Sequence, residues 1–220
     1  MIQRLLLVCL FGLPLALPDT APRTVEVSVQ RAHGEDWETI DARTVFKPGE
    51  QIRFRFRANF PGYLYVLDET SSGTFVWLFP DQNSGLNNQV QPDQWSLVPA
   101  TQGAFGIPPT AGYETIYWVV SPAPLRDLNL EGSGPPRTIP HTTMVPRCEE
   151  SVLQARGSCL DRKAGPKPLS DTARLQQIIG TGPSLRSRDI AFDRSSKSTR
   201  LKVRNLAGDA LVYEFWIAHQ

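Results

Sequence analysis

The chain has 220 residues, of which 40% are hydrophobic and 20% charged, so it is long enough and apolar enough to bury a core. This composition excludes a wholly disordered polymer, and the 19 prolines and 16 glycines favour a fold of short strands and many turns. The formal net charge of +1 gives no global reason to expect a nucleic-acid partner, because non-specific phosphate binding needs a strong positive excess or a patch.

The amino terminus has the pattern of a signal peptide. Arg4 precedes an apolar run from Leu5 to Leu17, which is shorter than the roughly 20 residues that a membrane-spanning helix needs. We therefore predict that residues 1–21 direct export and are removed, with the cleavage position left open between Ala16 and Arg23. The expected location is the periplasm or the cell surface, with no stable membrane span after signal removal.

Two cysteines remain beyond this segment, Cys148 and Cys159. An exported chain meets an oxidising compartment, so we expect the pair to form one disulfide. Two free thiols are one alternative and a metal site is another. The metal site is disfavoured because two cysteines without a nearby histidine pair do not supply the four ligands of structural zinc. No metal site and no cofactor is predicted.

A period of two residues dominates the first half of the chain. In Gln51 to Ala58, apolar residues alternate with arginines, which predicts a strand with one buried and one solvated face. The strands expected at Tyr63 to Asp68 and Thr74 to Phe79 would continue it as an antiparallel meander. Further strands are expected at Thr24 to Gln30 and at Tyr113 to Val120, the latter buried on both faces.

The second half begins with a long proline-rich excursion from Ser121 to Pro168. A short helix is expected at Ser170 to Ile179, with one apolar face and Gly180 at its end. Three strands follow, at Arg186 to Asp193, Thr199 to Arg204 and Ala210 to Ala218.

The last two of these strands are expected to form a hairpin. In the register that we predict, Val203 lies opposite Leu211, Leu201 opposite Tyr213, and Arg200 opposite Glu214.

These elements predict an all-β fold. We expect residues 22–220 to form a single extracytoplasmic domain, an immunoglobulin-like antiparallel β-sandwich with one short helix and the long proline-rich excursion. A small β-barrel is the alternative.

Several blocks in this order resemble a known family. They are Phe46 to Ile52, Gly62 to Leu67, Leu78-Phe79-Pro80 and Gly112 to Pro122. Over about residues 45–124 they are similar to the bacterial family of domains of unknown function called DUF4384. The resemblance implies an extracytoplasmic or surface-associated β domain, attached in some relatives to caspase-like peptidases or protein kinases. It carries over no catalytic residue.

The sequence lacks the common motifs of enzyme chemistry. It contains no HExxH, GxSxG or phosphate-loop motif, and its three histidines, His33, His141 and His219, are scattered. We therefore predict no enzyme but a non-enzymatic binding or scaffolding module of the cell envelope or surface. The alternative is an enzyme or a peptidase-associated regulatory domain whose site no linear motif reveals.

The charges are unevenly distributed and suggest where a partner binds. Residues 22–136 contain 8 basic and 13 acidic side chains, whereas residues 137–220 contain 14 basic and 8 acidic ones. Alternation places basic side chains on one face of each of two strands. If both rows lie on the same side of the sandwich, they would attract an acidic protein surface or another anionic envelope component. The alternative is an ordinary solvated face. The candidate binding residues are Arg53, Arg55, Arg57, Arg200, Lys202 and Arg204.

Overall fold

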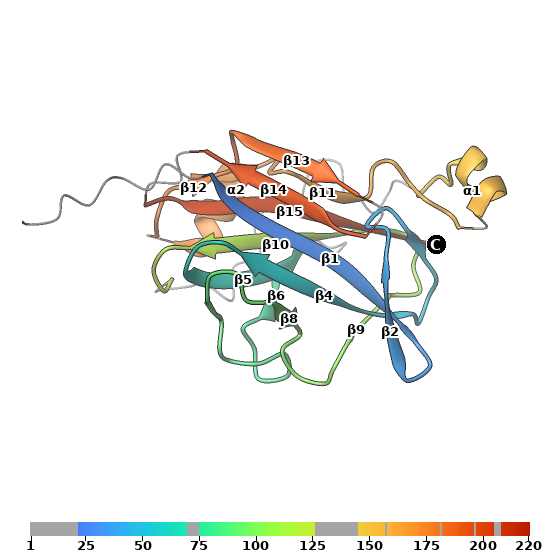
Figure 1. The fold of residues 1–220 in the computed structure, drawn as a ribbon, viewed down its shortest axis with the longest axis horizontal. Coiled ribbons are helices and arrows are strands. Elements are labelled where there is room, and N and C mark those ends of the chain that lie inside the picture. The colour runs from blue at the N-terminus through green and yellow to red at the C-terminus, as the bar shows by residue number, and fades with distance from the viewer. Residues whose placement is uncertain are drawn as a thin grey trace, which may run out of the picture.

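The computed structural model describes residues 22–69, 75–125, 145–156, 158–180, 182–195, 197–204 and 208–220 (Figure 1). Fifteen strands and two short helices lie in these residues. The predicted signal peptide at residues 1–21 and His141 lie outside them. None of the helices in the described part of the chain is long and apolar enough to cross a bilayer.

The strands form two sheets. In the first sheet the order is β13-β14-β1-β4-β8, with β2 beside β1 and β9 beside β4. Its strands are β1 (Arg23–His33), β2 (Asp36–Ile40), β4 (Gln51–Ala58), β8 (Ser96–Val98), β9 (Phe105–Gly106), β13 (Ile190–Arg194) and β14 (Thr199–Val203).

In the second sheet the order is β11-β15-β10-β5-β6, with β3 and β12 beside β15 and β7 beside β5. Its pairs are antiparallel except for those of β3 and β12 with β15, which are parallel. Its strands are β3 (Val45–Phe46), β5 (Gly62–Glu69), β6 (Phe75–Phe79), β7 (Gln89–Val90), β10 (Gly112–Ser121), β11 (Gly165–Pro168), β12 (Leu185–Arg186) and β15 (Ala210–His219).

The two sheets pack face to face around one apolar core, which confirms the predicted sandwich over the small barrel. β4 shows how the sequence produces this packing, since its apolar residues alternate with arginines and turn inward. The Phe54 ring centroid lies 5.2 Å from that of Trp118 on β10, and Phe56 stacks on the same indole at 5.7 Å. Aromatic contacts therefore join the sheets at their centre.

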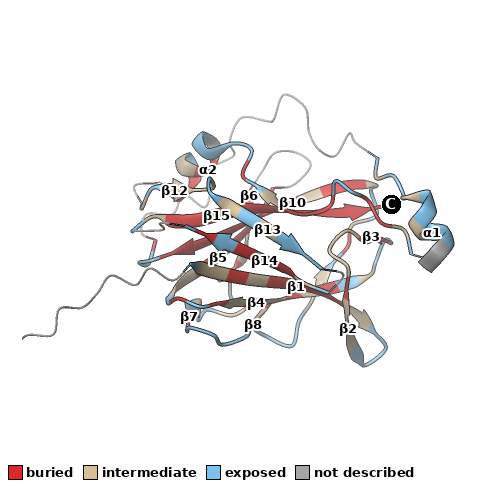
Figure 2. Ribbon diagram, turned by 45° about the horizontal axis from the view of Figure 1, so that its top comes forward, coloured by how far each residue is buried: buried red, intermediate tan, exposed pale blue. Residues whose placement is uncertain are grey.

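The second sheet is covered on its outer face as well. Helix α2 (Thr172–Ile179) places Leu175, Ile178 and Ile179 in an apolar cluster with outward-facing residues of that sheet, including Tyr117 and Val212. A separate cluster with Val45 and Ala164 covers Tyr113, Trp216 and Ala218 at the other end. Together the two clusters explain why β10 and β15 are buried along nearly their whole length, whereas β4 and β14 alternate (Figure 2). The predicted helix is thus confirmed, beginning two residues later than expected.

Two predicted pairings are wrong, because consecutive strands belong to different sheets. β4 lies in the first sheet and β5 in the second, so the meander begins only with the β5–β6 pair. β14 and β15 are separated in the same way, and β14 pairs with β1 and β13 instead. The physical reason is the distribution of apolar residues. Both faces of β15 are mostly apolar, which suits the sheet that is covered on both sides, whereas β14 has one solvent-exposed face.

The C-terminal half differs from expectation in two further places. The strand expected at Arg186 to Asp193 is divided into β12 and β13, and Asp189 between them has a positive φ of 61°. The proline-rich excursion contains a second helix, α1 (Glu150–Arg156), and the edge strand β11, and the sequence pattern predicts neither of them.

Candidate functional site

The two predicted rows of basic residues lie on the same outer face of the first sheet. β1 runs between β4 and β14, and its register places Glu26 opposite both Arg57 and Arg200. Lys202 lies opposite Thr24 on the same face, and Arg204 follows the end of β14 and is exposed. We call this surface the basic face, defined by Arg53, Arg55, Arg57, Arg200, Lys202 and Arg204.

A single carboxylate joins the two rows. Oε2 of Glu26 accepts a hydrogen bond from Nη2 of Arg57 at 2.7 Å and another from Nη2 of Arg200 at 3.3 Å. Burial disfavours the charged form of Glu26, but the hydrogen bonds from Arg57, Arg200 and Ser198 outweigh it and hold its pKa below the ordinary value. Glu26 is therefore ionised at neutral pH and neutralises part of the positive charge at the centre of the face.

Two tryptophans hold the β4 arginines in place. The guanidinium of Arg53 lies 4.1 Å from the ring centroid of Trp37, and its Nε donates to Oε1 of Gln30 at 2.8 Å. The guanidinium groups of Arg55 and Arg57 lie 4.3 and 4.6 Å from the ring centroid of Trp95. Cation–π stacking of this kind restricts the guanidinium and leaves its N–H edges available to an anion.

A shallow cavity of about 200 Å³ opens between the rows. Three cations and two carboxylates line it, together with polar groups at the start of β1 and the end of β4. Its lining residues include Thr24, Glu26, Arg57, Asn59, Asp93, Arg200 and Lys202.

Part of the positive charge on this face is not neutralised by a neighbour. Within the described residues, Arg55, Lys202 and Arg204 have no carboxylate within ion-pair distance. Asp193 lies opposite Arg200 in the β13–β14 pair and adds one negative charge at the margin. The basic residues still outnumber the carboxylates, and the face is suited to hold several anionic groups at once.

The sequence pattern predicts the six basic residues of this surface but not the contributions of Trp37, Trp95 and Glu26. Trp37 lies on β2, and Trp95 lies in the segment before β8, far from β14 in sequence. The only signal that could have found Glu26 is its position on an alternating strand between two valines, which shows its outward direction but not its neighbours.

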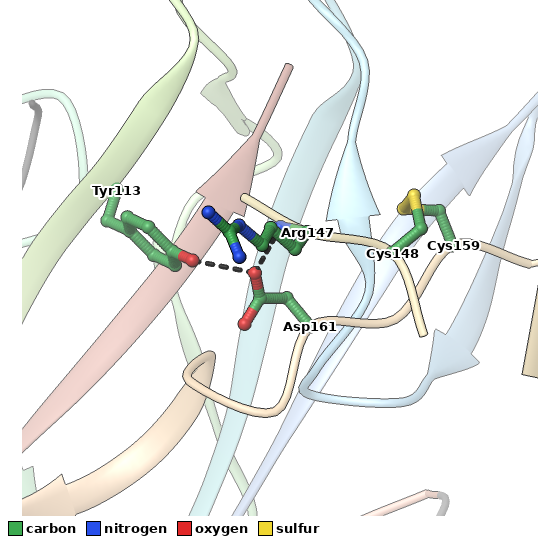
Figure 3. The surroundings of a disulfide bond; sticks show 5 residues. All are labelled: Tyr113, Arg147, Cys148, Cys159 and Asp161. Atoms are coloured by element: carbon green, nitrogen blue, oxygen red, sulfur yellow. Dashed lines mark hydrogen bonds between the residues drawn. A yellow bond between two sulfur atoms is a disulfide. The ribbon is translucent and has the colours of Figure 1, made fainter. Parts of the chain in front are cut away.

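A second feature is the predicted disulfide, which the structure confirms. Cys148 and Cys159 are bonded, with their Cα atoms 4.8 Å apart (Figure 3). They close the loop that carries α1, and a backbone hydrogen bond from Glu149 to Leu160 joins its two ends. Backbone hydrogen bonds from Val45 to Cys159 and from Asp161 to Arg43 attach the loop to the sandwich.

A cavity of about 660 Å³ lies beside the disulfide, with Tyr113, Arg147 and Asp161 among its lining residues. Asp161 accepts hydrogen bonds from the Tyr113 hydroxyl at 2.7 Å and from the backbone N–H groups of Arg147 at 2.6 Å and Lys163 at 2.7 Å. Burial opposes its ionisation, but these donors hold the pKa of Asp161 below its ordinary value. The carboxylate is thus engaged in fastening the loop (Figure 3).

The histidines lie apart from the basic face and from each other in the part of the chain that the structure describes. There, no group of three or more His, Cys, Asp or Glu side chains is arranged to hold a metal ion. His33 ends β1 in the first sheet, whereas His219 is buried at the end of β15, where its Nε2 lies 3.5 Å from Oε1 of Glu114.

Asp68 lies on β5 and has a strongly perturbed carboxyl group. Burial, reinforced by the charges of Glu114 and Glu69, raises its pKa to about 8. Its Oδ1 is buried without a hydrogen-bond partner among the described residues.

One segment of the chain is similar to a known protein family. The model of a family described as a domain of unknown function (DUF4384) matches residues 45–124, the segment from β3 through β10. The matched segment contains the arginines of β4, but not β1 or β14. No curated protein matches, and no solved structure matches. The predicted family resemblance is therefore confirmed over this segment of the chain.

Proposed function

We propose that this chain is an exported, non-enzymatic binding or scaffolding module of the cell envelope that holds an anionic component on its basic face. The observation that carries the proposal is the convergence of two basic rows, from strands almost 150 residues apart in the chain, on one outer face of the sandwich.

The geometry favours an extended ligand with several anionic groups over a single small ion. Side chains two residues apart on a strand are separated by roughly 7 Å, and strands two places apart in a sheet by roughly 10 Å. The basic face therefore presents a two-dimensional array of cations. Planar guanidinium groups bind carboxylate and phosphate oxygens in pairs, so polyuronate chains and phosphate headgroups both fit its chemistry.

Export rests on the apolar run from Leu5 to Leu17 and on the disulfide between Cys148 and Cys159. Such bonds persist in oxidising compartments and are rare in the cytosol. Both features agree with a location where anionic polymers and lipid headgroups are accessible.

The test is binding of the purified protein to alginate and to vesicles of phosphatidylglycerol with phosphatidylcholine. Dextran and vesicles of phosphatidylcholine alone are the neutral controls. We expect binding to the anionic probes only, weakening steeply between low and physiological salt as the screening length shortens to about 8 Å. The preferred anionic probe distinguishes a glycan from a lipid partner.

A matched pair of variants locates the binding surface. R55Q/K202Q removes two cations of the basic face, and R147Q/R188Q removes two exposed cations elsewhere. We expect the first variant to lose about 3- to 30-fold in affinity, since each exposed ion pair contributes about 0.3 to 1 kcal/mol, and the second to bind like wild type. Equal losses in both variants would show that only net charge matters and would contradict the proposal.

A further inference from the structure

The cavity between the two basic rows has a cation at one end and a carboxylate at the other. Lys202 lies opposite Thr24, whose backbone N–H donates to Oδ1 of Asn59 at 2.7 Å. Beside Asn59, the backbone N–H of Asp93 donates to the carbonyl of Ala58 at 2.7 Å. A row of polar groups therefore runs from Lys202 on β14, across the start of β1 and the end of β4, to Asp93, and all five residues line the cavity.

Neither charge at the ends of this row is paired within the described residues. No oppositely charged group of that part of the chain lies within ion-pair distance of Lys202 or of Asp93. The backbone nevertheless fixes Asp93, which has a positive φ of 60° and its N–H bonded to Ala58. A left-handed conformation is uncommon outside glycine, and such residues cluster at sites that hold ligands. The exposed Asp93 carboxylate is therefore suited to a cationic group of a ligand.

The cationic side of the cavity has donors to spare for an anionic group. Glu26 takes one N–H group each from Nη2 of Arg57 and Nη2 of Arg200, and a guanidinium carries five. Their other N–H groups, the ammonium of Lys202 and the hydroxyl of Thr24 all line the same cavity. Several donors around one position are what a phosphate or carboxylate group needs.

We propose that this cavity binds a phosphoethanolamine group, with the phosphate beside Lys202 and the ammonium on the carboxylate of Asp93. The cavity volume of about 200 Å³ equals about six or seven water molecules at roughly 30 Å³ each, which suits a small polar group and not a length of polymer. A wholly anionic group would leave Asp93 unpaired beside it. A group with charges of both signs satisfies both ends of the row.

This inference rests on the proposed function, because it names the group that the centre of the basic face holds. The same group occurs as the headgroup of phosphatidylethanolamine and as a free phosphomonoester, and the two sources are separated by the test. Phosphocholine is the matched comparison. Its trimethylammonium carries the same charge but has no N–H to donate to Asp93, and it is bulkier.

The test compares binding of the full chain after export to vesicles of phosphatidylethanolamine with phosphatidylcholine and to vesicles of phosphatidylcholine alone. Both lipids have no net charge, so attraction between net charges predicts no difference. We expect binding only where phosphatidylethanolamine is present, or, if the source is soluble, calorimetric binding of free O-phosphoethanolamine but not of phosphocholine. Lack of preference in both the vesicle and the soluble arm would overturn the proposal.

The variant D93N removes the partner of the ammonium and keeps the fold, since asparagine tolerates a positive φ as well as aspartate does. We expect it to bind the preferred phosphoethanolamine probe about 2- to 5-fold more weakly than wild type, the size of one exposed ion pair. D36N, which removes an exposed carboxylate on β2, should bind like wild type.

Binding of D93N that equals wild type would refute the role of Asp93 and with it the proposal. Alginate separates this inference from the proposed function, because it carries no ammonium and D93N should bind it at least as tightly as wild type does. Loss of alginate binding with the phosphoethanolamine preference intact would contradict the proposed function alone. Alginate binding without that preference would contradict this inference alone.

Discussion

Arg57 and Arg200 lie on strands separated by β1, and both donate to the same oxygen atom of Glu26. This arrangement ties the two basic rows together and partly neutralises both arginines. The predicted register had placed Arg200 opposite Glu214, but Glu214 lies in the other sheet, where it accepts hydrogen bonds from Ser170 and from Nε1 of Trp216. Because β14 pairs with β1 and not with β15, Arg200 lies at the centre of the basic face.

Replacing Glu26 with glutamine should tighten binding to alginate or anionic vesicles, because it leaves Arg57 and Arg200 free to bind the ligand. The expected loss of stability is small, about 1 kcal/mol or less, since both arginines are partly exposed and solvent screens the pairs. Binding at several salt concentrations and urea unfolding measure the two effects. Weaker binding by E26Q would show that Glu26 positions the arginines rather than competing for them.

Replacing Trp95 with alanine should weaken anion binding although no charge is removed. Arg55 and Arg57 both stack on this ring, and without it their guanidinium groups lose a fixed orientation. Stacking on an exposed ring is worth about 0.5 to 1 kcal/mol per cation, which corresponds to a loss of several-fold in affinity. W95F keeps an aromatic face and is the control that should bind nearly as wild type does.

Truncating Phe54 to alanine should destabilise the protein by about 3 to 5 kcal/mol, because its ring is fully buried and contacts both Trp118 and Phe215. Arg55→Ala, one residue along the same strand, should change the free energy of unfolding by less than about 1 kcal/mol, since its side chain lies on the solvated face. Urea unfolding compares the two variants. Similar midpoints for F54A and wild type would contradict the packing described for β4.

The sequence predicts those features of the fold that depend on neighbouring residues. It does not predict the features that depend on contacts between segments far apart in the chain. Alternation in β4 is local, so the sequence alone predicts that Phe54 is buried and that Arg55 lies on the solvated face. The hairpin expected between Val203 and Leu211 was wrong because short connections suggest pairing, whereas burial on both faces draws Leu211 into the covered sheet. Covering of that sheet by α2 is a tertiary property, and no local pattern contains it.

For the candidate site, too, the sequence predicts the local features but not the contacts between strands. Alternation along each strand predicts which way each basic side chain points. The two basic rows share one face only because β1 pairs with β4 on one side and with β14 on the other. Stacking of Arg53 on Trp37 and of Arg55 on Trp95 joins residues on different elements. Such contacts are determined by strand order, which the sequence pattern alone leaves open.

Reducing the disulfide should lower stability without unfolding the sandwich. Closing a loop of about twelve residues contributes roughly 3 kcal/mol in the chain-entropy model, and the strands of the core are tethered elsewhere. The double variant C148S/C159S should therefore show a lower unfolding midpoint and unchanged far-ultraviolet circular dichroism. Reaction of both cysteines with a thiol reagent in the folded, oxidised protein would show that the bond is absent.

Asp68 should make stability depend on pH in the direction opposite to most carboxylates. Its pKa is raised from 3.8 to about 8 on folding, so the folded state favours the protonated form. The stabilising effect of protonation is complete below about pH 4 and is lost as pH rises through about 8, because the unfolded chain releases this proton more readily. Asp68→Asn, which resembles the protonated carboxyl in shape and charge, should be more stable than wild type at pH 8.

Urea unfolding of D68N and wild type between about pH 4 and pH 9 measures this difference, which should grow with pH and level off above the folded-state pKa. Glu114 and Glu69 contribute to the raised pKa, and His219 lies against Glu114, so a change in any of these groups would alter the curve. Asp36→Asn, at an exposed position on β2, is the matched control, and its difference from wild type should stay constant. A D68N difference that is equally constant would mean that water reaches the Asp68 carboxylate and that its burial does not govern its ionisation.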